Sequence, residues 1–196
     1  GSITPPPGIT GFWTPYSKEV SGAYLFASKR LGFRPWREDD LPAFAAMNAD
    51  AAVMEHFPKT LSEEESAAFL ARLQDHFQEY GYCYYAVEIR ETGEWIGFIG
   101  LAFQAYKTAF TPAVDIGWRL KKDAWGRGYA TEGARECLDY AFKELELEHI
   151  ISTCTLSNKA SERVMQKIGM ERMGEFNHPR LRSYPRYERC VCYGIR

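Results

Sequence analysis

The chain has 196 residues, with 24 lysines and arginines against 26 aspartates and glutamates, so its formal net charge is −2. This length fits one globular domain, the 45% apolar content excludes a disordered chain, and the negative balance argues against nucleic-acid binding. No apolar run approaches the roughly 20 residues that a membrane helix needs, so we expect no membrane association. The five cysteines form no C-x-x-C pair, which indicates reduced thiols in a cytoplasmic protein.

Residues 1–22 form a predicted N-terminal arm, and residues 23–196 form a single predicted domain. The arm contains three consecutive prolines, Pro5 to Pro7, which favour an extended chain. It has neither the basic nor the apolar region of a secretory signal. Its Gly1-Ser2 start resembles a cloning tag, so we expect part of the arm to be a tag.

The first half of the domain predicts helices placed between strands. Ser62 and Glu65 form a capping box that opens a helix with one apolar face, and Gly81 is expected to end it. The E-T-G-E sequence at 91–94 is a turn signal between two strands. In order, the predicted elements are a strand over 24–33, helices over 41–47, 51–56 and 62–81, and strands over 82–89 and 95–103.

The second half alternates strands with two helices. Asn158 is a capping residue for the second of these helices, and Gly169 is expected to end it. The full order is neither a regular βα alternation nor an all-β chain. We therefore expect a mixed α/β (α+β) fold with about six or seven strands and helices on both faces of the sheet. The predicted elements are strands over 113–120, 150–156, 170–176 and 187–195, and helices over 130–145 and 158–169.

The loop that follows strand 113–120 carries the strongest chemical signal. It contains Gly126, Gly128 and three basic residues, and a helix begins directly after it. Glycines let a backbone approach a ligand closely, and a helix start presents unpaired N–H groups to an anion. The dinucleotide fingerprint fails at Thr131, and no G-K-[ST] sequence of a Walker loop is present. The loop therefore predicts a phosphate cradle of another type, or else a glycine-rich turn with solvated cations.

This loop resembles the pyrophosphate loop of the GNAT superfamily of acetyl-CoA-dependent N-acetyltransferases, whose pattern is Q/R-x-x-G-x-G/A. Gly128 and Ala130 match the pattern, and Trp125 stands at its leading position. Residues 158–170 are similar to the N-x-x-S-x-x-V-x-x-K-x-G-[FM] signature of the branch that contains ribosomal-protein N-terminal (alanine/serine) acetyltransferases. Residues 176–181 resemble a segment of bacterial members of that branch.

The resemblance implies a strongly twisted mixed sheet and acetyl-CoA as cosubstrate, with no metal. Acetyl-CoA would lie in a V-shaped split between strands 113–120 and 150–156, with a bulged, unpaired amide near Arg119 or Leu120 polarising the thioester carbonyl. Asn158 would hold the pantetheine arm, or would only cap its helix. The implied cofactor-binding residues are Trp118, Arg119, Leu120, Trp125, Gly126, Arg127, Gly128, Tyr129, Ala130, Thr131, Asn158, Ser161 and Lys167.

The implied reaction is direct transfer of the acetyl group to a primary amine in a ternary complex, which needs a base for the amine. Asp115 is the first candidate; family members often have Glu at this position, and the shorter Asp favours action through a water. The alternative role for Asp115 is an ion pair with Arg119, which lies on the same face of the strand. Glu55 is the second candidate base. Ser161 stands in place of the tyrosine acid of many members, so we expect from it a hydrogen bond to sulfur or a bond to its own helix backbone.

The acceptor is left open between a protein N-terminus and a small amine such as a polyamine, an amino acid or an antibiotic. Tyr84 or Tyr85 is expected to line the acceptor groove. His56 and His178 lack partners at metal-ligand spacing, which argues against a metal site. The competing hypothesis is a non-catalytic sensor module that binds CoA or another phosphate ligand. The resemblance also suggests a homodimer.

Overall fold

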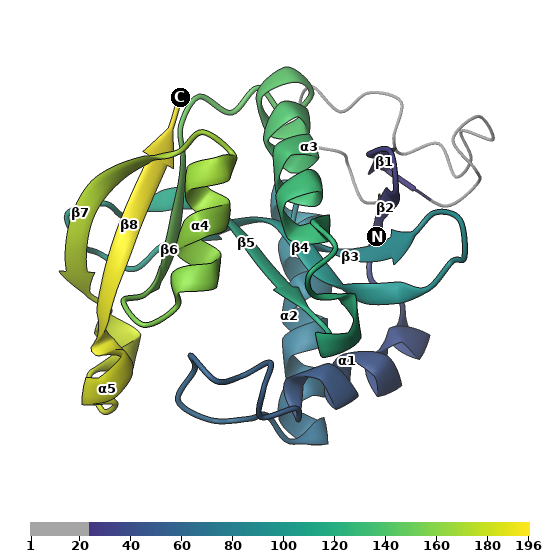
Figure 1. The fold of residues 1–196 in the computed structure, drawn as a ribbon, viewed down its shortest axis with the longest axis horizontal. Coiled ribbons are helices and arrows are strands. Elements are labelled where there is room, and N and C mark those ends of the chain that lie inside the picture. The colour runs from purple at the N-terminus through teal and green to yellow at the C-terminus, as the bar shows by residue number, and fades with distance from the viewer. Residues whose placement is uncertain (1–23) are drawn as a thin grey trace.

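The computed structural model describes residues 24–196 (Figure 1), so the predicted N-terminal arm lies outside the described residues. The strands are β1 (Phe26–Ala27), β2 (Leu31–Arg34), β3 (Tyr84–Ile89), β4 (Trp95–Gln104), β5 (Ala113–Leu120), β6 (Ile150–Thr155), β7 (Glu171–Asn177) and β8 (Arg189–Ile195). The helices are α1 (Leu41–Asn48), α2 (Glu63–Tyr80), α3 (Tyr129–Lys143), α4 (Lys159–Lys167) and α5 (Pro185–Glu188). Short 3-10 helices cover Glu38–Asp40, Lys122–Ala124 and Pro179–Leu181.

The strands form one mixed sheet of eight strands in the order β1-β2-β3-β4-β5-β6-β8-β7. Neighbouring strands are antiparallel except β5 and β6, which run parallel. This architecture confirms the predicted fold class. The strand count exceeds the expected six or seven because residues 24–33 do not form one strand: β1 folds back on β2, with Phe26 opposite Phe33.

The sheet opens between β5 and β6. These two strands share the single register pair Asp115–Ile151, whereas β4 and β5 pair along the whole length of β5. In Figure 1 the part of the sheet with β6, β8 and β7 turns away from the part with β5 and β4. The sheet therefore has the V-shaped split that the resemblance implied, open toward the carboxyl ends of β5 and β6.

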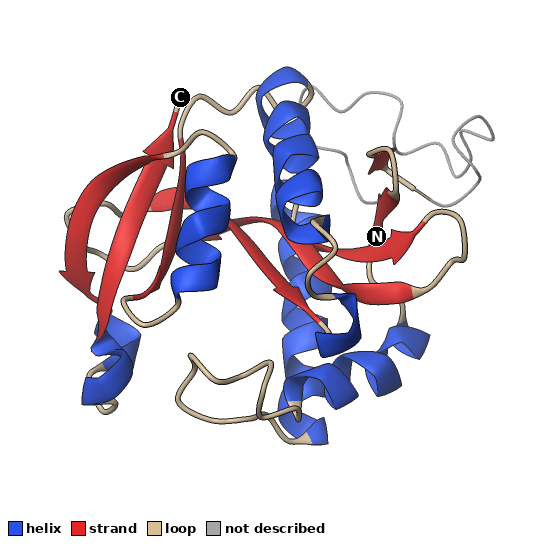
Figure 2. Ribbon diagram, viewed as in Figure 1, coloured by secondary structure: helices blue, strands red, loops and turns tan. Residues whose placement is uncertain are grey.

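Helices cover both faces of the sheet, as predicted. In Figure 2, α3 and α4 lie in front of the sheet and α2 lies behind it. The α3 side is packed closely, because a Cβ atom on Gly133 would lie 2.4 Å from Ile99 Cδ1. On the opposite side, Phe44 of α1 and Phe69 of α2 meet edge-on and both contact Phe98 of β4. Alternate side chains of β5 therefore enter two different environments.

The helix ends form where the sequence predicts them. Ser62 Oγ accepts from the Glu65 amide while the Glu65 carboxylate accepts from the Ser62 amide, and Gly81 ends α2 with a φ of 80°. The Asn158 side chain caps α4 by accepting from the amide of Ser161. These signals act within one turn of the chain, so they do not depend on the rest of the fold.

The helix predicted over 51–56 is wrong, because this segment is a series of turns. One bond from the Met54 amide to the Asp50 carbonyl closes a single turn, and nucleation without propagation does not yield a stable helix. The last strand was expected from residue 187 but begins at Arg189, because Pro185 opens the one-turn helix α5.

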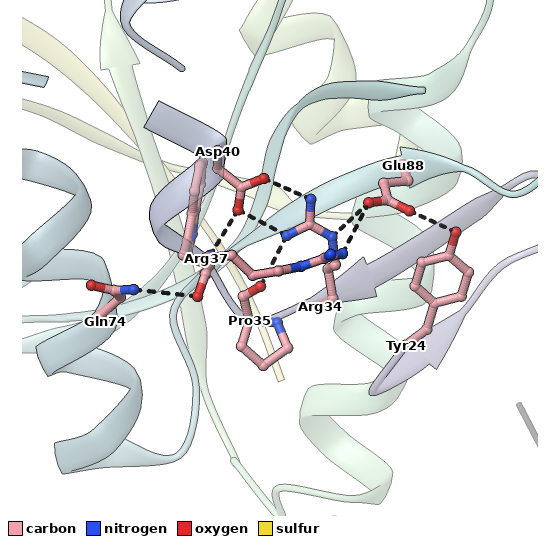
Figure 3. A network of polar contacts seen from close by, with 8 residues as sticks. Tyr24, Arg34, Pro35, Arg37, Asp40, Gln74 and Glu88 are labelled. Carbon is pink, nitrogen blue, oxygen red and sulfur yellow. Dashed lines mark hydrogen bonds and ion pairs between the residues drawn. The ribbon is translucent and has the colours of Figure 1, made fainter. Parts of the chain in front are cut away.

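A buried arginine joins β2 to its neighbours (Figure 3). Arg34 donates from Nη1 and Nη2 to the two carboxylate oxygens of Asp40, each at 2.8 Å, and from Nε to Glu88 on β3 at 2.6 Å. Tyr24 donates to the other oxygen of Glu88 at 2.9 Å. Burial opposes both charged forms, but the hydrogen bonds between Arg34 and Asp40 raise the pKa of Arg34 and lower the pKa of Asp40. The buried cation of Arg34 thus has two carboxylate partners, Asp40 and Glu88.

Candidate active site

The loop before α3 has the geometry of an anion cradle. Gly126 and Gly128 have φ values of 76° and 77°, in the left-handed region that favours glycine. A Cβ atom on Gly126 would meet nothing within 4 Å, so the loop needs glycine there for its backbone conformation and not for space. The first helical bond of α3 runs from the Glu132 amide to the Gly128 carbonyl. The amides of residues 129–131 precede it and are presented to a ligand.

Side chains on both sides hold this loop in place. Trp125 donates from Nε1 to the Leu120 carbonyl at 2.9 Å, so the residue that replaces the family's Gln or Arg closes the loop on β5. Arg30 pairs with Glu132 at 2.6 Å and its guanidinium lies 4.4 Å from the centre of the Tyr129 ring. Arg127 takes part in none of the ion pairs found within residues 24–196, so it can meet a phosphate.

Two backbone amides of β5 point into the split. The Lys121 amide donates to the Ile96 carbonyl of β4. In an antiparallel pair the backbone groups of every second residue bond the partner strand. The backbone amides of odd-numbered β5 residues therefore point to β4, and those of even-numbered residues point to β6. Ser152 of β6 donates its hydroxyl to the Ile116 carbonyl at 2.8 Å. Further along, β6 has diverged, so the amides of Trp118 and Leu120 face the open split.

The expected bulge near Arg119 or Leu120 is wrong. The register between β4 and β5 runs without a break. Register shifts occur instead between β3 and β4, where Ile96 of β4 is skipped, and between β7 and β8, where Met173 of β7 is skipped. The amides that face the split are available because β6 turns away from β5, and no irregularity of β5 itself is needed.

Asp115 is a buried carboxylate on the side of β5 that faces α1 and α2. Its Oδ1 accepts from the Tyr84 hydroxyl at 2.6 Å and its Oδ2 from Gln104 Nε2 at 3.2 Å. Burial raises the pKa of Asp115 to about 7, although these two hydrogen bonds favour the charged form. A carboxylate with such a pKa is suited to accept a proton near neutral pH.

The alternative ion pair between Asp115 and Arg119 does not form. Arg119 donates from Nη1 to Asn48 Oδ1 at 2.8 Å, on α1, while Asp115 is held by β3 and β4. Of the two tyrosines expected at the acceptor groove, Tyr84 contacts Asp115 and Tyr85 is fully buried in the core. Tyr84 therefore remains the tyrosine at this site.

The start of α4 lies across the split from β5. Asn158 uses Oδ1 to accept from the Ser161 amide at 3.2 Å, so the helix-cap role is present and its Nδ2 group is left to donate elsewhere. Ser161 lies in the first turn with its amide thus satisfied. Lys167 is at the far end of this helix, which places it about 13 Å from Asn158 at 1.5 Å per residue. Its carbonyl accepts from Arg135 of α3 at 2.8 Å.

The connection between α1 and α2 reaches across the mouth of the split. His56 Nδ1 lies 3.0 Å from Ser157 Oγ, just before α4, and Tyr187 of α5 donates to the Glu55 carbonyl at 3.5 Å. The Glu55 side chain is 70% exposed and lies 3.8 Å from His56 Nε2. Glu55 is thus much more exposed than Asp115, and it remains the second candidate base.

Sequence reasoning missed Gln104 and Tyr106. Gln104 is a polar residue at the end of the apolar β4, and this change of character was the available signal. Tyr106 lies in an irregular connection with no such signal. Its ring is 4.5 Å from that of His178, and the Arg180 guanidinium lies 5.3 Å from its centre. Arg180 in turn lowers the pKa of Asp115, against the larger effect of burial.

Residues 24–196 contain neither a candidate metal-binding cluster nor a helix that could span a membrane. No group of three or more His, Cys, Asp or Glu side chains within residues 24–196 could hold a metal ion. In the same part of the chain, every helix is too short or too polar to cross a membrane.

Known proteins resemble this chain in sequence and fold. A family model described as an acetyltransferase (GNAT) domain matches residues 30–171. N-acetyltransferase YnaD of Bacillus subtilis (strain 168) is 35% identical over 150 residues, which cover 76% of this chain and 84% of YnaD. The crystal structure of a GNAT-family acetyltransferase from Bacillus anthracis has a TM-score of 0.69 and 29% identity over 86% of this chain and 96% of that one. RimL, a ribosomal L7/L12 alpha-N-protein acetyltransferase in complex with coenzyme A, shares the fold with a TM-score of 0.69 and 18% identity, over 86% and 94% of the two chains.

The split sheet, with an anion cradle at the start of α3, is the architecture of an acyl-CoA-dependent transferase. The chain belongs to the GNAT family of acetyltransferases. It is an acetyl-CoA-dependent acyltransferase that acts on amines, and the family predicted from the residues is confirmed.

Proposed function

We propose that the chain transfers the acetyl group of acetyl-CoA to a primary amine by direct attack in a ternary complex. The amine nitrogen attacks the thioester carbonyl carbon, the carbon–sulfur bond breaks, and the CoA thiolate leaves and takes up, by way of solvent, the second proton that the attacking nitrogen loses as the amide forms. Asp115 receives the proton that the acceptor ammonium gives up, directly or through a water. The observation that carries this proposal is the position of Asp115: a buried carboxylate with a pKa of about 7, on the strand that borders the split and at the point where β5 and β6 are still paired.

The cofactor is proposed to pass through the split. Its pyrophosphate lies on the amides of residues 126–131, where Arg127 and the start of α3 favour negative charge. Its thioester oxygen accepts from the amide of Trp118 or Leu120, which stabilises the charge that develops on oxygen during attack. The Asn158 Nδ2 group donates to the pantetheine arm, and the Ser161 hydroxyl donates to the departing sulfur.

The structural features favour an enzyme over a binding module. A sensor needs the cradle but has no need for a buried carboxylate with a raised pKa, which lowers stability at neutral pH. We infer a cytoplasmic protein, because the five cysteines are all free thiols. The family resemblance predicts a homodimer. The proposed acceptor is either a protein N-terminus or a small amine.

The test is calorimetric titration with acetyl-CoA, with CoA, NAD and ATP as comparisons, followed by an amine panel monitored by thiol release. We expect acetyl-CoA and CoA to bind selectively and at least one amine to be acetylated. Asp115→Asn should then slow transfer about 100-fold or more without weakening acetyl-CoA. Binding without turnover on any amine would favour the sensor hypothesis. If the folded protein does not bind acetyl-CoA, the loop before α3 is not a cofactor-binding site.

A further inference from the structure

Arg119 is a partly buried cation on β5 without a carboxylate partner. It takes part in none of the ion pairs found within residues 24–196, and its Nε is buried with no hydrogen-bond partner. Desolvation lowers the pKa of Arg119 to about 10. Arg34 is buried in the same domain but binds two carboxylates. Taking part of a charged group out of water without a counter-charge is costly, so an anion that is not part of the chain would stabilise Arg119.

The guanidinium of Arg119 is fixed in orientation. Nη1 donates to Asn48 Oδ1 at 2.8 Å, and the fully buried Asn48 donates from Nδ2 to Ser66 Oγ at 3.1 Å. No hydrogen bond among the described residues uses Nε or Nη2, which form the edge that binds a carboxylate through two parallel bonds. The rings around the guanidinium carbon are those of Phe57, Phe69 and Phe98, with centres 4.6, 5.7 and 5.2 Å away.

The place of Arg119 connects it to the reaction. Asp115, Gly117 and Arg119 share the face of β5 that meets α1 and α2. The residues on either side of Arg119, Trp118 and Leu120, supply the amides that face the split. A group bound by Arg119 therefore lies on the acceptor side of the position proposed for the acetyl group.

Three exposed arginines follow β7, and the first of them, Arg180, acts on Asp115. Arg180, Arg182 and Arg186 are exposed, and none of them appears among the ion pairs within residues 24–196. Arg180 is close enough to lower the pKa of Asp115. These charges would attract a negatively charged acceptor and repel a polyamine.

We propose that the acceptor is an amine that also carries a carboxylate, and that Arg119 binds this carboxylate through Nε and Nη2. The inference rests on the proposed function, because it names the class of acceptor for that site. The carboxylate can belong to an amino acid, or to an acidic residue next to a peptide N-terminus. Both sources present the same chemistry to the guanidinium.

The experiment compares acceptors that differ only in this group. Each amino acid is paired with its α-amide, and the C-terminally amidated peptide Ala-Glu is paired with Ala-Gln. The value of kcat/KM is measured for wild type, Arg119→Gln, Arg119→Lys and the control Arg172→Gln, which removes an exposed cation on β7 that pairs with Glu175. Titration with acetyl-CoA accompanies each variant.

We expect the wild-type enzyme to prefer the carboxylate in the amino-acid pairs, the peptide pair or both, and the pair that shows the preference identifies the source. Arg119→Gln should lower kcat/KM for that acceptor about tenfold or more and should lower it much less for the amide partner. The variant keeps the backbone of residue 119, whose amide bonds β4 and not the split, so any change in acetyl-CoA affinity should be small. Arg119→Lys keeps the positive charge but lacks the two parallel N–H donors of a guanidinium, so it should recover part of the preference. The control Arg172→Gln should keep the full preference.

Four results would overturn the proposal. Equal rates within every pair would show that acceptors are acetylated without a carboxylate, and the proposed function would stand alone. An equal loss for both members of a pair in Arg119→Gln would assign the residue a structural role, and weaker acetyl-CoA binding would assign it to the cofactor. If no acceptor is acetylated, both the proposed function and this inference are contradicted.

Discussion

Tyr84 donates a hydrogen bond of 2.6 Å to Asp115 Oδ1, and Gln104 bonds both of these side chains. The two donors stabilise the charged carboxylate, whereas burial stabilises its protonated form. The pKa of about 7 is the balance of these effects. Asp115 therefore changes its charge near neutral pH, and the hydrogen bond from Tyr84 lowers the pH at which this change occurs.

Removing the Tyr84 hydroxyl should move the pH dependence of the reaction. In the proposed reaction the charged form of Asp115 is the proton acceptor, so kcat/KM should rise with pH through about 7. In Tyr84→Phe the carboxylate loses a donor, so the rising limb should move to higher pH by about one unit. The measurement is a pH profile with one acceptor, so that the ionisation of the amine is the same for every variant.

Tyr82→Phe is the matched control for this change. Tyr82 is also buried and precedes the same strand, but its hydroxyl makes no hydrogen bond to Asp115. Its profile should coincide with that of the wild-type enzyme. A profile for Tyr84→Phe that does not move would show that Asp115 is not the group that limits the rate.

The raised pKa of Asp115 also has a consequence for stability. The folded state holds this proton more tightly than the unfolded chain, so the contribution of Asp115 to stability is complete below pH 4 and is lost as pH rises through about 7. Asp115→Asn removes the ionisation. Compared with wild type, the variant should gain free energy of unfolding between pH 5 and pH 8, as measured by urea denaturation at each pH. A difference that does not change with pH would contradict a raised pKa.

Gly128 can be tested against another glycine of the same conformation. Gly128→Val should weaken acetyl-CoA binding at least about tenfold, because a branched side chain disfavours the left-handed backbone that presents the cradle amides. Gly93, in the β3–β4 hairpin, has a φ of 73° and open space around it. Gly93→Val bears a similar backbone strain away from the cradle, and calorimetry should find its acetyl-CoA affinity unchanged. Equal losses in the two variants would indicate a general effect on folding.

Asn158→Asp separates the two roles of Asn158. Aspartate can still accept from the Ser161 amide and cap α4, but it has no amide group to donate. The variant should keep the thermal stability of the wild-type enzyme and bind acetyl-CoA more weakly. Asn158→Ala should lose both, with about 1 kcal/mol of stability from the missing cap. Unchanged affinity in Asn158→Asp would leave Asn158 as a helix cap alone.

The features that the sequence predicts correctly are those encoded within a few residues. The capping box at Ser62, the cap at Asn158 and the glycine-rich loop before α3 each require only their own turn of chain. The family resemblance depends on these local patterns too. The fold class followed because the order of such elements restricts the possible sheets.

The environment of Asp115 could not be predicted in this way. Its partners Tyr84 and Gln104 lie 31 and 11 residues away in sequence, on two other strands. Which side chain reaches the carboxylate depends on the register of β3, β4 and β5 together. For the same reason, the pairing of Arg119 with Asn48, 71 residues away, replaces the ion pair that adjacency on one strand suggested.

The single register pair between β5 and β6 gives the sheet an opening from one side to the other. The cradle at the start of α3 lies on one side, and Asp115 faces the other. In the proposed reaction, acetyl-CoA and the amine would thus enter from opposite sides of the sheet, so neither would have to leave for the other to bind. The acetylated product would then depart while CoA stays bound, and an acceptor attached to a macromolecule would need to insert only its end.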